Sequence, residues 1–282
     1  ARIIYRPKRP YPLGFDLSGV VVGKGEEVSD FEIGDEVYSK VTWEQMGTIA
    51  SHLVVRSDMV ALKPSNISFE EAAGIPLVGT TVFDSFRIGK VKKGTRILIH
   101  AGSGGIGTFA IQYAKYLGAY VYTTTSTENV EWVKALGADC VIDYKTEDYR
   151  TIVKDIDVVY DTLGRKYLRE AISVVKKGGA IISIAGHFDN ETLGELGLSK
   201  FIMPFNSIKG SVLMYRMRRK NIFYKYVFSK ANQELLNEIT ALIEQGEIKP
   251  INDLVFDFDQ AIEALVYVKN GRSKGKVVVK IK

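Results

Sequence analysis

The sequence is poor in cysteine, with Cys140 as the only one among 282 residues. A single thiol excludes an intrachain disulfide, and it excludes a zinc site built from Cys-x-x-Cys pairs. No apolar run approaches the length that spans a bilayer. Cys140 itself lies in a short apolar run and is interpreted as a small core residue. These absences favour a protein of the reducing cytoplasm that has no membrane segment.

Neither sign of charge dominates the chain. Lys and Arg number 38 against 33 Asp and Glu, and the net charge is +5. The charges fall in short mixed stretches, apart from one basic cluster at residues 216–220, which we interpret as a solvated face. No nucleic-acid partner is expected. A 46% hydrophobic and 25% charged composition is typical of a soluble protein, and the length allows two domains.

What the chain does have is a glycine-rich turn, Gly102-Ser103-Gly104-Gly105-Ile106-Gly107. It follows the apolar run 96–99 and leads into a segment with apolar residues at helical spacing, 106–117. The turn satisfies G-x-G-x-x-G, whose glycines allow a tight turn, the approach of a pyrophosphate to the backbone and close helix–strand packing. The free N–H groups of the helix N-terminus then favour phosphate binding.

The segments around this turn alternate between strand and helix. Apolar runs at 119–125, 140–143, 157–161 and 180–184 are separated by helical spacers, beginning with 128–136. Parallel strands need such crossover helices, so the pattern predicts a Rossmann fold, a doubly wound parallel sheet, over residues 77–223. The other interpretation is an open α/β domain whose loop holds no ligand.

The two ends of the chain are predicted to build a second domain, from residues 1–76 and 224–282. Short β-rich runs at 13–28, 31–39, 49–55 and 59–63 suggest a small antiparallel barrel. After a helix expected over 223–246, the chain returns through 255–259, a helix at 260–269 and a final strand at 276–281. Ser68 and Glu71 have the spacing of a capping box.

Several segments carry a family resemblance, and they span nearly the whole chain in the family's order. The segments are the run from Gly14 to Ser39, Ile75 to Asp84, the glycine turn, Leu136 to Tyr144, Asp161 to Gly164, and Gly271 to Val279. The chain resembles the medium-chain dehydrogenases/reductases, and the zinc-free quinone oxidoreductase branch in particular. The resemblance implies a Rossmann domain inserted into a GroES-like barrel.

Two departures from the family pattern matter. Zinc-dependent members carry Gly-His-Glu and an upstream cysteine, whereas this chain has Gly14-Phe15-Asp16 and no such cysteine, so no metal is expected. Members also begin with several strands before the position of Gly14, where this chain has thirteen residues. Either the chain is truncated or its barrel is incomplete. Because Ala1 is not Met, a removed leader stays open.

The residues after the second predicted strand bear on the cofactor. Residues 124–127 read Thr-Thr-Ser-Thr, without the carboxylate that binds the ribose hydroxyls of NAD(H). This favours NADP(H), and the resemblance implies Ser126 as the first contact of the 2′-phosphate and Tyr144 as the second. Glu128 could instead bind a ribose diol, which leaves NAD(H) as the alternative.

The resemblance implies further cofactor contacts outside the turn. Thr81 matches a position that faces the nicotinamide, Leu163 and Gly186 follow strands at their carboxyl ends, and Lys276 lies in the closing motif. No catalytic acid is assigned. We interpret His52 and His100 as structural, His187 as a loop residue and Asp16 as a hydrogen-bonding residue of the barrel, and Tyr38 and Tyr215 are pocket candidates. The run 208–213 is expected to be the last strand and to pair across a homodimer axis.

The function implied by the resemblance is hydride transfer from NADPH to a quinone or an α,β-unsaturated carbonyl, a small-molecule substrate, without zinc. The protein would mainly orient the cofactor and the acceptor. The alternative is an NADPH-binding protein without turnover, acting as a sensor, partner or structural protein.

Overall fold

The computed structural model describes residues 13–195, 212–271 and 273–281. The chain divides into two compact units, each described here by itself. The barrel unit comprises residues 1–83 and 229–282, and the nucleotide unit comprises residues 84–228. The sequence prediction placed these boundaries at 76/77 and 223/224. The first boundary of the structure falls within helix α2 (Pro76–Ile88).

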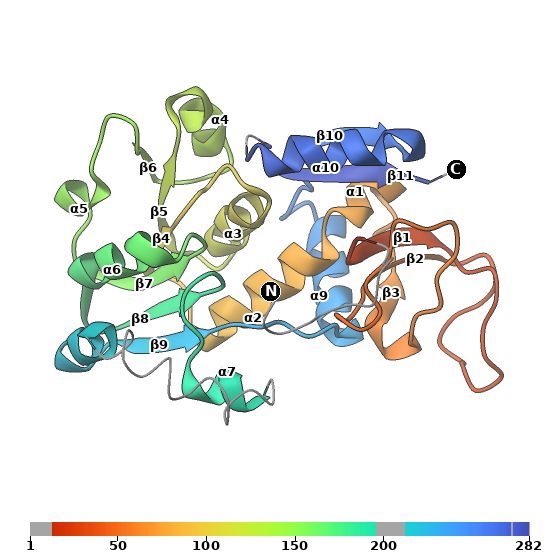
Figure 1. Cartoon of the computed structure of the whole chain (residues 1–282), viewed down its shortest axis with the longest axis horizontal. Coiled ribbons are helices and arrows are strands. Elements are labelled where there is room, and N and C mark those ends of the chain that lie inside the picture. Colours follow the sequence, from red (N-terminus) through yellow and green to blue (C-terminus); the bar gives the residue numbers. More distant parts are fainter. Residues whose placement is uncertain (1–12, 196–211, 272, 282) are drawn as a thin grey trace. The chain divides into compact units, whose positions relative to one another are not determined.

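The nucleotide unit is built on a six-stranded sheet in the order β6-β5-β4-β7-β8-β9, and all neighbours pair in parallel. Figure 1 shows the strands in this order from β6 at the top to β9 at the bottom. The central strands come from opposite halves of the unit, so the order reverses next to β4, as in a doubly wound sheet. The predicted fold class is therefore confirmed. The strands are β4 (Arg96–Ile99), β5 (Tyr120–Thr125), β6 (Cys140–Asp143), β7 (Ile156–Asp161), β8 (Val175–Ser183) and β9 (Phe223–Tyr226).

Both faces of this sheet are buried, which explains the continuous apolar runs of its strands. Leu98 of β4 joins a core with residues of α5, β7 and α6, whereas Ile97 and Ile99 point to the other face. The helices of the unit include α3 (Gly105–Tyr116), α4 (Val130–Ala135) after the 3-10 turn η2 (Thr127–Asn129), α5 (Tyr149–Ile152), α6 (Arg165–Val174) and α7 (Asn190–Glu195).

The barrel unit contains a three-stranded antiparallel sheet made by the first part of the chain. Its strands are β1 (Asp16–Val20), β2 (Glu36–Lys40) and β3 (Val60–Leu62), which follows the 3-10 turn η1 (Ser57–Met59). Helix α9 (Gln233–Glu244) from the end of the chain packs beside it, and the Tyr38 hydroxyl donates to the Leu236 carbonyl at 2.7 Å. Helix α1 (Phe69–Ala73) begins at Ser68 with the predicted capping box to Glu71.

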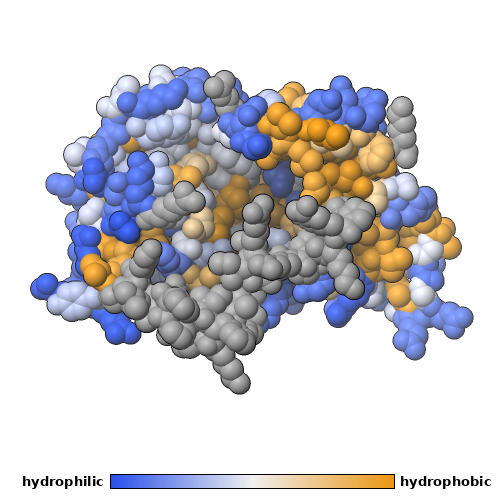
Figure 2. Space-filling view, viewed as in Figure 1, coloured by the Kyte–Doolittle hydropathy of each residue, from blue (hydrophilic) through white to orange (hydrophobic). Residues whose placement is uncertain are grey.

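The second sheet of this unit comes from the last part of the chain. β10 (Asn252–Asp257) pairs in parallel with β11 (Lys276–Lys280), and η3 (Phe258–Gln260) and α10 (Ala261–Lys269) connect them. Figure 2 shows hydrophobic side chains on the surface over α10 and β10. They include Ile262, 74% exposed, and Val266, 53% exposed. In the described residues, the predicted barrel thus takes the form of two small sheets.

Two predictions of secondary structure were wrong, and one lies outside the described residues. The helix expected from residue 223 starts only at Gln233, because the aromatic run Phe223–Tyr226 pairs with β8 as the last strand of the sheet. Residues 49–55 form no strand, and Val54 there is 91% exposed. Residues 208–211 of the run predicted as the last strand are not described, and residues 212–219 are helical.

The basic cluster at 216–220 belongs to that helical segment and the turn after it. Arg216, Arg218 and Arg219 are exposed, whereas Met217 is buried in the core of the unit. The ammonium group of Lys220 donates to the carbonyl of Ile172 in the last turn of α6 at 2.8 Å. The cluster is therefore one solvated helix face and one helix cap.

Candidate functional site

The glycine turn links the end of β4 to the start of α3, as the sequence predicted. Two of its glycines are required by packing alone. A Cβ at Gly102 would lie 2.3 Å from the Thr123 hydroxyl oxygen, and a Cβ at Gly107 would lie 2.3 Å from the Ala101 carbonyl oxygen. The Gly102 N–H donates to the Thr124 carbonyl at 2.9 Å, which ties the turn to β5. These residues bring helix and sheet into close contact.

Gly104 differs from its neighbours, because a Cβ there would meet only the Ala101 carbonyl oxygen, at 3.5 Å. Gly104 is the N-cap of α3, and its carbonyl accepts from the Thr108 N–H at 2.9 Å, the first bond of the helix. The N–H groups of residues 105–107 therefore precede the intrahelical bonding pattern. The turn presents open space beside a row of N–H donors, which is the arrangement that binds phosphate.

The ends of β5 and β6 lie beside each other, and they bring the two predicted contacts of the 2′-phosphate close together. The Tyr144 N–H donates to the Thr125 carbonyl at 3.0 Å, directly before Ser126. The Ser126 side chain is buried and accepts a hydrogen bond from the Asn129 amide at 3.0 Å, whereas Tyr144 is 57% exposed. The Thr127 hydroxyl donates to Asp143 at 2.6 Å and locks the two turns together.

One ion pair at this corner was missed by sequence reasoning. The Lys145 ammonium lies 2.8 Å from the Glu128 carboxylate, with the side chains 48% and 58% exposed. The hydrogen bond from Lys145 is the largest cause that lowers the pKa of Glu128 to about 2. No cation follows β5 directly, since residues 126–129 read Ser-Thr-Glu-Asn. The structure provides one from the end of β6, and the adjacency of β5 and β6 in a parallel sheet is the signal that could have indicated it.

A fully buried carboxylate, Asp161, joins the loops that follow three strands. It accepts hydrogen bonds from the Ser183 hydroxyl at 2.8 Å and the Gly164 N–H at 2.9 Å, and it lies 3.2 Å from Nδ1 of His100. Burial alone would raise the pKa of Asp161, but these hydrogen bonds and His100 more than offset it, so the pKa is lowered. His100 is fully buried, in agreement with a structural role.

The loops after β7 and β8 touch each other at two glycines. Gly164 has φ +64°, and a Cβ there would lie 2.1 Å from the Ala185 carbonyl oxygen. A Cβ at Gly186 would lie 2.6 Å from the Ser183 hydroxyl, which accepts the Gly186 N–H at 2.8 Å. The predicted contacts Leu163, 38% exposed, and Gly186 therefore lie on adjoining loops at the carboxyl ends of their strands.

Two other predicted cofactor contacts belong to the barrel unit. Thr81 is a buried residue of α2. Lys276 forms an ion pair with Asp16 at 3.2 Å, and the other Asp16 oxygen accepts from the Leu77 N–H at 2.7 Å. Asp16 is thus the hydrogen-bonding residue that the sequence predicted, and it holds β11 and α2 to β1.

The tyrosines and the remaining histidines were weaker predictions. Tyr38 is fully buried and bonded to α9, so it is a core residue and not a pocket residue. Tyr215 is 60% exposed on the helical segment 212–219. His52 is exposed, and His187 is an exposed loop residue whose carbonyl accepts a hydrogen bond from Tyr224.

The residues at the zinc position of the metal-dependent relatives do not fit a metal. The Phe15 ring packs edge-on against Trp43 at 4.6 Å, and Asp16 is engaged as described above. Within residues 13–195, 212–271 and 273–281, no group of three or more His, Cys, Asp or Glu side chains is placed to hold a metal ion. The same ranges contain no helix that is both long and apolar enough to cross a bilayer.

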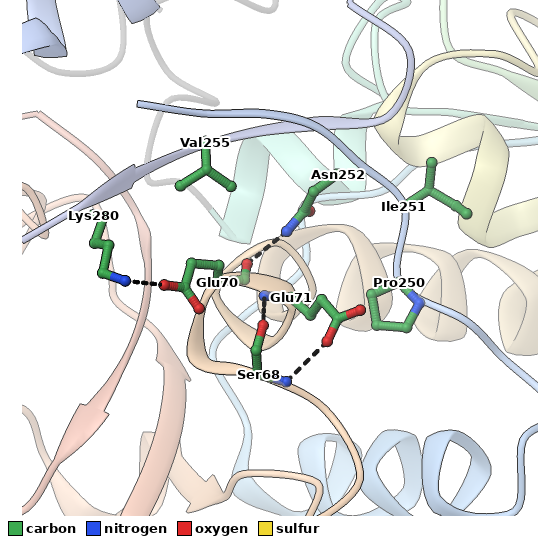
Figure 3. Close-up of a pocket in the computed structure, with 8 residues that line it drawn as sticks. All are labelled: Ser68, Glu70, Glu71, Pro250, Ile251, Asn252, Val255 and Lys280. Carbon is green, nitrogen blue, oxygen red and sulfur yellow. Dashed lines mark hydrogen bonds and ion pairs between the residues drawn. The ribbon is translucent and has the colours of Figure 1, made fainter. Parts of the chain in front are cut away.

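A pocket of about 490 Å³ opens in the barrel unit, between α1 and β10. Figure 3 shows Lys280 paired to Glu70, and the Glu71 carboxylate turned back to the backbone N–H of Ser68. The Asn252 amide donates to the Glu70 carbonyl at 2.6 Å. These contacts hold α1 against the second sheet, and the phosphate-binding geometry lies in the nucleotide unit instead.

Comparison with protein families agrees with this architecture. Residues 2–65 match the family described as alcohol dehydrogenase GroES-like domain, and residues 136–279 match the family described as zinc-binding dehydrogenase. The second match alone covers just over half of the chain.

Three curated relatives align over almost the whole chain. The 2-methylene-furan-3-one reductase of Solanum lycopersicum is 33% identical over 94% of this chain, and the NADPH-dependent alkenal/one oxidoreductase, chloroplastic, of Arabidopsis thaliana is 32% identical over 94%. The NAD(P)H oxidoreductase RTN4IP1, mitochondrial, of Danio rerio is 32% identical over 96%. The chain spans 62%, 63% and 72% of the lengths of these three relatives, respectively.

Two solved structures share the fold. The quinone oxidoreductase from Coxiella burnetii has a TM-score of 0.82 at 28% identity, covering 97% of this chain and 80% of that one. The Escherichia coli quinone oxidoreductase complexed with NADPH has a TM-score of 0.80 at 25% identity, covering 98% and 84%. With its parallel nucleotide-binding sheet and its GroES-like domain, the chain belongs to the medium-chain dehydrogenase/reductase superfamily, in its quinone oxidoreductase-like branch.

Proposed function

We propose that this chain is a zinc-independent oxidoreductase that uses NADPH to reduce a quinone or an α,β-unsaturated carbonyl. The observation that carries the proposal is Gly104, the one glycine of the G-x-G-x-x-G positions whose absent Cβ leaves space open beside the N-terminus of α3. The names of the relatives and of the E. coli complex support a nicotinamide cofactor and these two acceptor classes.

The residues of the nucleotide unit have separate roles in this proposal. The N–H groups of residues 105–107 bind the pyrophosphate, and the corner at Ser126 and Tyr144 binds the adenosine ribose with its 2′-phosphate. The loops at Leu163 and Gly186 receive the nicotinamide end. When bound, the cofactor supplies the hydride. Thr81 and Lys276 of the barrel unit are proposed as additional contacts.

The protein's contribution to the reaction is orientation and exclusion of water. Negative charge that develops on the acceptor oxygen requires a hydrogen-bond donor, which a backbone N–H can provide. None of the three histidines is assigned this task, because His100 is buried against Asp161 and the other two are exposed. With no side chain assigned to the acceptor oxygen, specificity for the acceptor depends on the shape of the site that receives it.

A second candidate is an NADPH-binding protein without turnover, which the lack of an assigned proton donor favours. A homodimer is proposed for either candidate. Among the described residues, β9 is the outermost strand on its side of the sheet and its Phe223 is 52% exposed, so it offers an edge for pairing.

The test is consumption of NADPH and NADH at 340 nm by the purified chain, against a panel of quinones and enones, with and without a chelator. We expect acceptor-dependent oxidation of NADPH in preference to NADH, unchanged by the chelator. Gly104→Ala tests the assigned site, since the substitution is expected to keep the fold and to obstruct the approach of the phosphates.

Each other outcome has a definite meaning. Tight NADPH binding without reduction of any acceptor supports the binding protein. Activity that the chelator abolishes contradicts zinc independence, and equal activity of the Gly104→Ala variant contradicts the assigned site.

A further inference from the structure

A carboxylate of the protein itself lies at the corner between the ends of β5 and β6. Glu128 lies in the first turn after β5, and its carboxylate is bound by Lys145 at 2.8 Å. Lys145 directly follows Tyr144, the predicted second contact of the 2′-phosphate, and Glu128 lies two residues after Ser126, the predicted first contact. The carboxylate thus has, as its neighbours, the donors expected around a phosphate.

Within the stretch 126–148, Lys145 is the basic residue that lies at this corner. Between residues 126 and 148 the sequence contains two basic residues, Lys134 and Lys145. Lys134 lies in the last turn of α4, away from the strand ends. The backbone of Lys145 is fixed, because its N–H donates to Asp143 at 3.0 Å and Asp143 is bound by Thr127 at 2.6 Å.

Little free energy is needed to separate Lys145 from Glu128 so that Lys145 can bind another anion. Both side chains are about half exposed, and ion pairs of that kind contribute little to stability. A phosphate carries more charge than a carboxylate and has three acceptor oxygens, so it competes well for the same ammonium group. Once displaced, Glu128 remains beside the ribose, where a carboxylate is suited to hydroxyl groups.

We propose that Lys145 and Glu128 together set the choice between the two nicotinamide cofactors, an inference that rests on the proposed function. Lys145 leaves Glu128 to bind the 2′-phosphate of NADPH. With NADH, the ion pair stays closed and Glu128 accepts hydrogen bonds from the ribose hydroxyls. The cation at this corner therefore comes from the end of β6 and not from the end of β5. In the absence of NADPH, Lys145 is paired with the carboxylate of Glu128.

The test is calorimetric binding of NADP⁺ and NAD⁺, together with adenosine 2′,5′-bisphosphate and AMP, which differ only in the 2′-phosphate. In Lys145→Gln we expect NADP⁺ and the bisphosphate to bind about ten- to a hundredfold more weakly, the usual contribution of a hydrogen bond to a charged group. NAD⁺ and AMP should change less than threefold. In Glu128→Gln we expect NADP⁺ to bind about two- to fivefold more tightly and NAD⁺ to bind more weakly.

Lys154→Gln is the matched control, because Lys154 is an exposed lysine just before β7, at the amino end of the strands. It should leave all four affinities unchanged. Equal weakening of NADP⁺ and NAD⁺ in Lys145→Gln, or no change in either, would overturn the inference while leaving cofactor binding intact. If the unaltered chain binds neither nucleotide, the proposed function itself fails.

Discussion

Two glycines of the same turn should respond in opposite ways to the same added methyl group. In Gly107→Ala the Cβ would lie 2.3 Å from the Ala101 carbonyl oxygen and 2.7 Å from Cα of Gly102, so α3 must move off the sheet. Overpacking of this kind costs up to about 3 kcal/mol. The better helix propensity of alanine returns about 1 kcal/mol at most. We expect a net loss of about 2 kcal/mol in the free energy of unfolding.

Gly104→Ala should instead have little effect on the stability of the fold and should weaken the binding of the cofactor. Gly104 has φ −80° and ψ 166°, an extended conformation open to any residue, and the nearest atom to a new Cβ is at 3.5 Å, an ordinary contact. The cost is that of replacing an N-cap glycine by alanine, about 1 kcal/mol or less. Because the methyl group occupies the approach to the N-terminus of α3, NADPH should bind at least about tenfold more weakly.

Urea unfolding and calorimetric titration with NADPH separate the two effects. The reasoning is refuted if Gly104→Ala binds NADPH as tightly as the unaltered chain, since the phosphates then do not approach this glycine. It is refuted equally if Gly107→Ala unfolds at the same urea concentration as the unaltered chain, since the close contact of helix and turn would then not limit the size of the residue at position 107.

Substitutions at three further positions test the framework of the two units. Asp161→Asn should lower the free energy of unfolding by about 1–3 kcal/mol at pH 7. Since the folded-state pKa of Asp161 is lowered, its contribution to the free energy of unfolding is lost as pH falls below about 4. Urea titrations from pH 6 to pH 2.5 should therefore show a smaller decrease in the free energy of unfolding for the variant than for the unaltered chain. Ser68→Ala should cost about 0.5–2 kcal/mol by urea unfolding, and Ser68→Asp should not. Tyr38→Phe should cost about 1 kcal/mol in the same assay, since the Leu236 carbonyl loses its donor.

The sequence was sufficient for the parts of the fold that depend on local pattern. The strand β6 begins and ends where the apolar run predicts, and the glycine turn lies between β4 and α3. Strands whose identity depends on a partner were harder. Phe223–Tyr226 is a strand because β8 lies beside it, and the aromatic residues favour a strand only weakly without that partner.

The residues of the candidate site likewise fall into those that could be predicted from local pattern and those that depend on distant partners. Gly102, Gly104 and Gly107 could be predicted because their roles follow from spacing within one turn. Lys145 could not, because its relation to Glu128 crosses 17 residues and exists only once β5 and β6 are neighbours. Tyr38 was misread for a related reason. Its partners lie on α9, some 200 residues away, and no local pattern marks an aromatic residue as core rather than pocket.

The distance along the chain between those partners has a consequence for how the protein is made. The nucleotide unit is continuous, so a ribosome completes it before the second segment of the barrel unit is synthesised. At 5–20 residues per second, the 198 residues between Tyr38 and Leu236 take about 10–40 s to translate. For that interval the sheet of β1, β2 and β3 is without α9, and its strands and apolar side chains are open to chaperones or to other nascent chains. Slowing translation should therefore reduce the yield of the barrel unit before it affects the nucleotide unit.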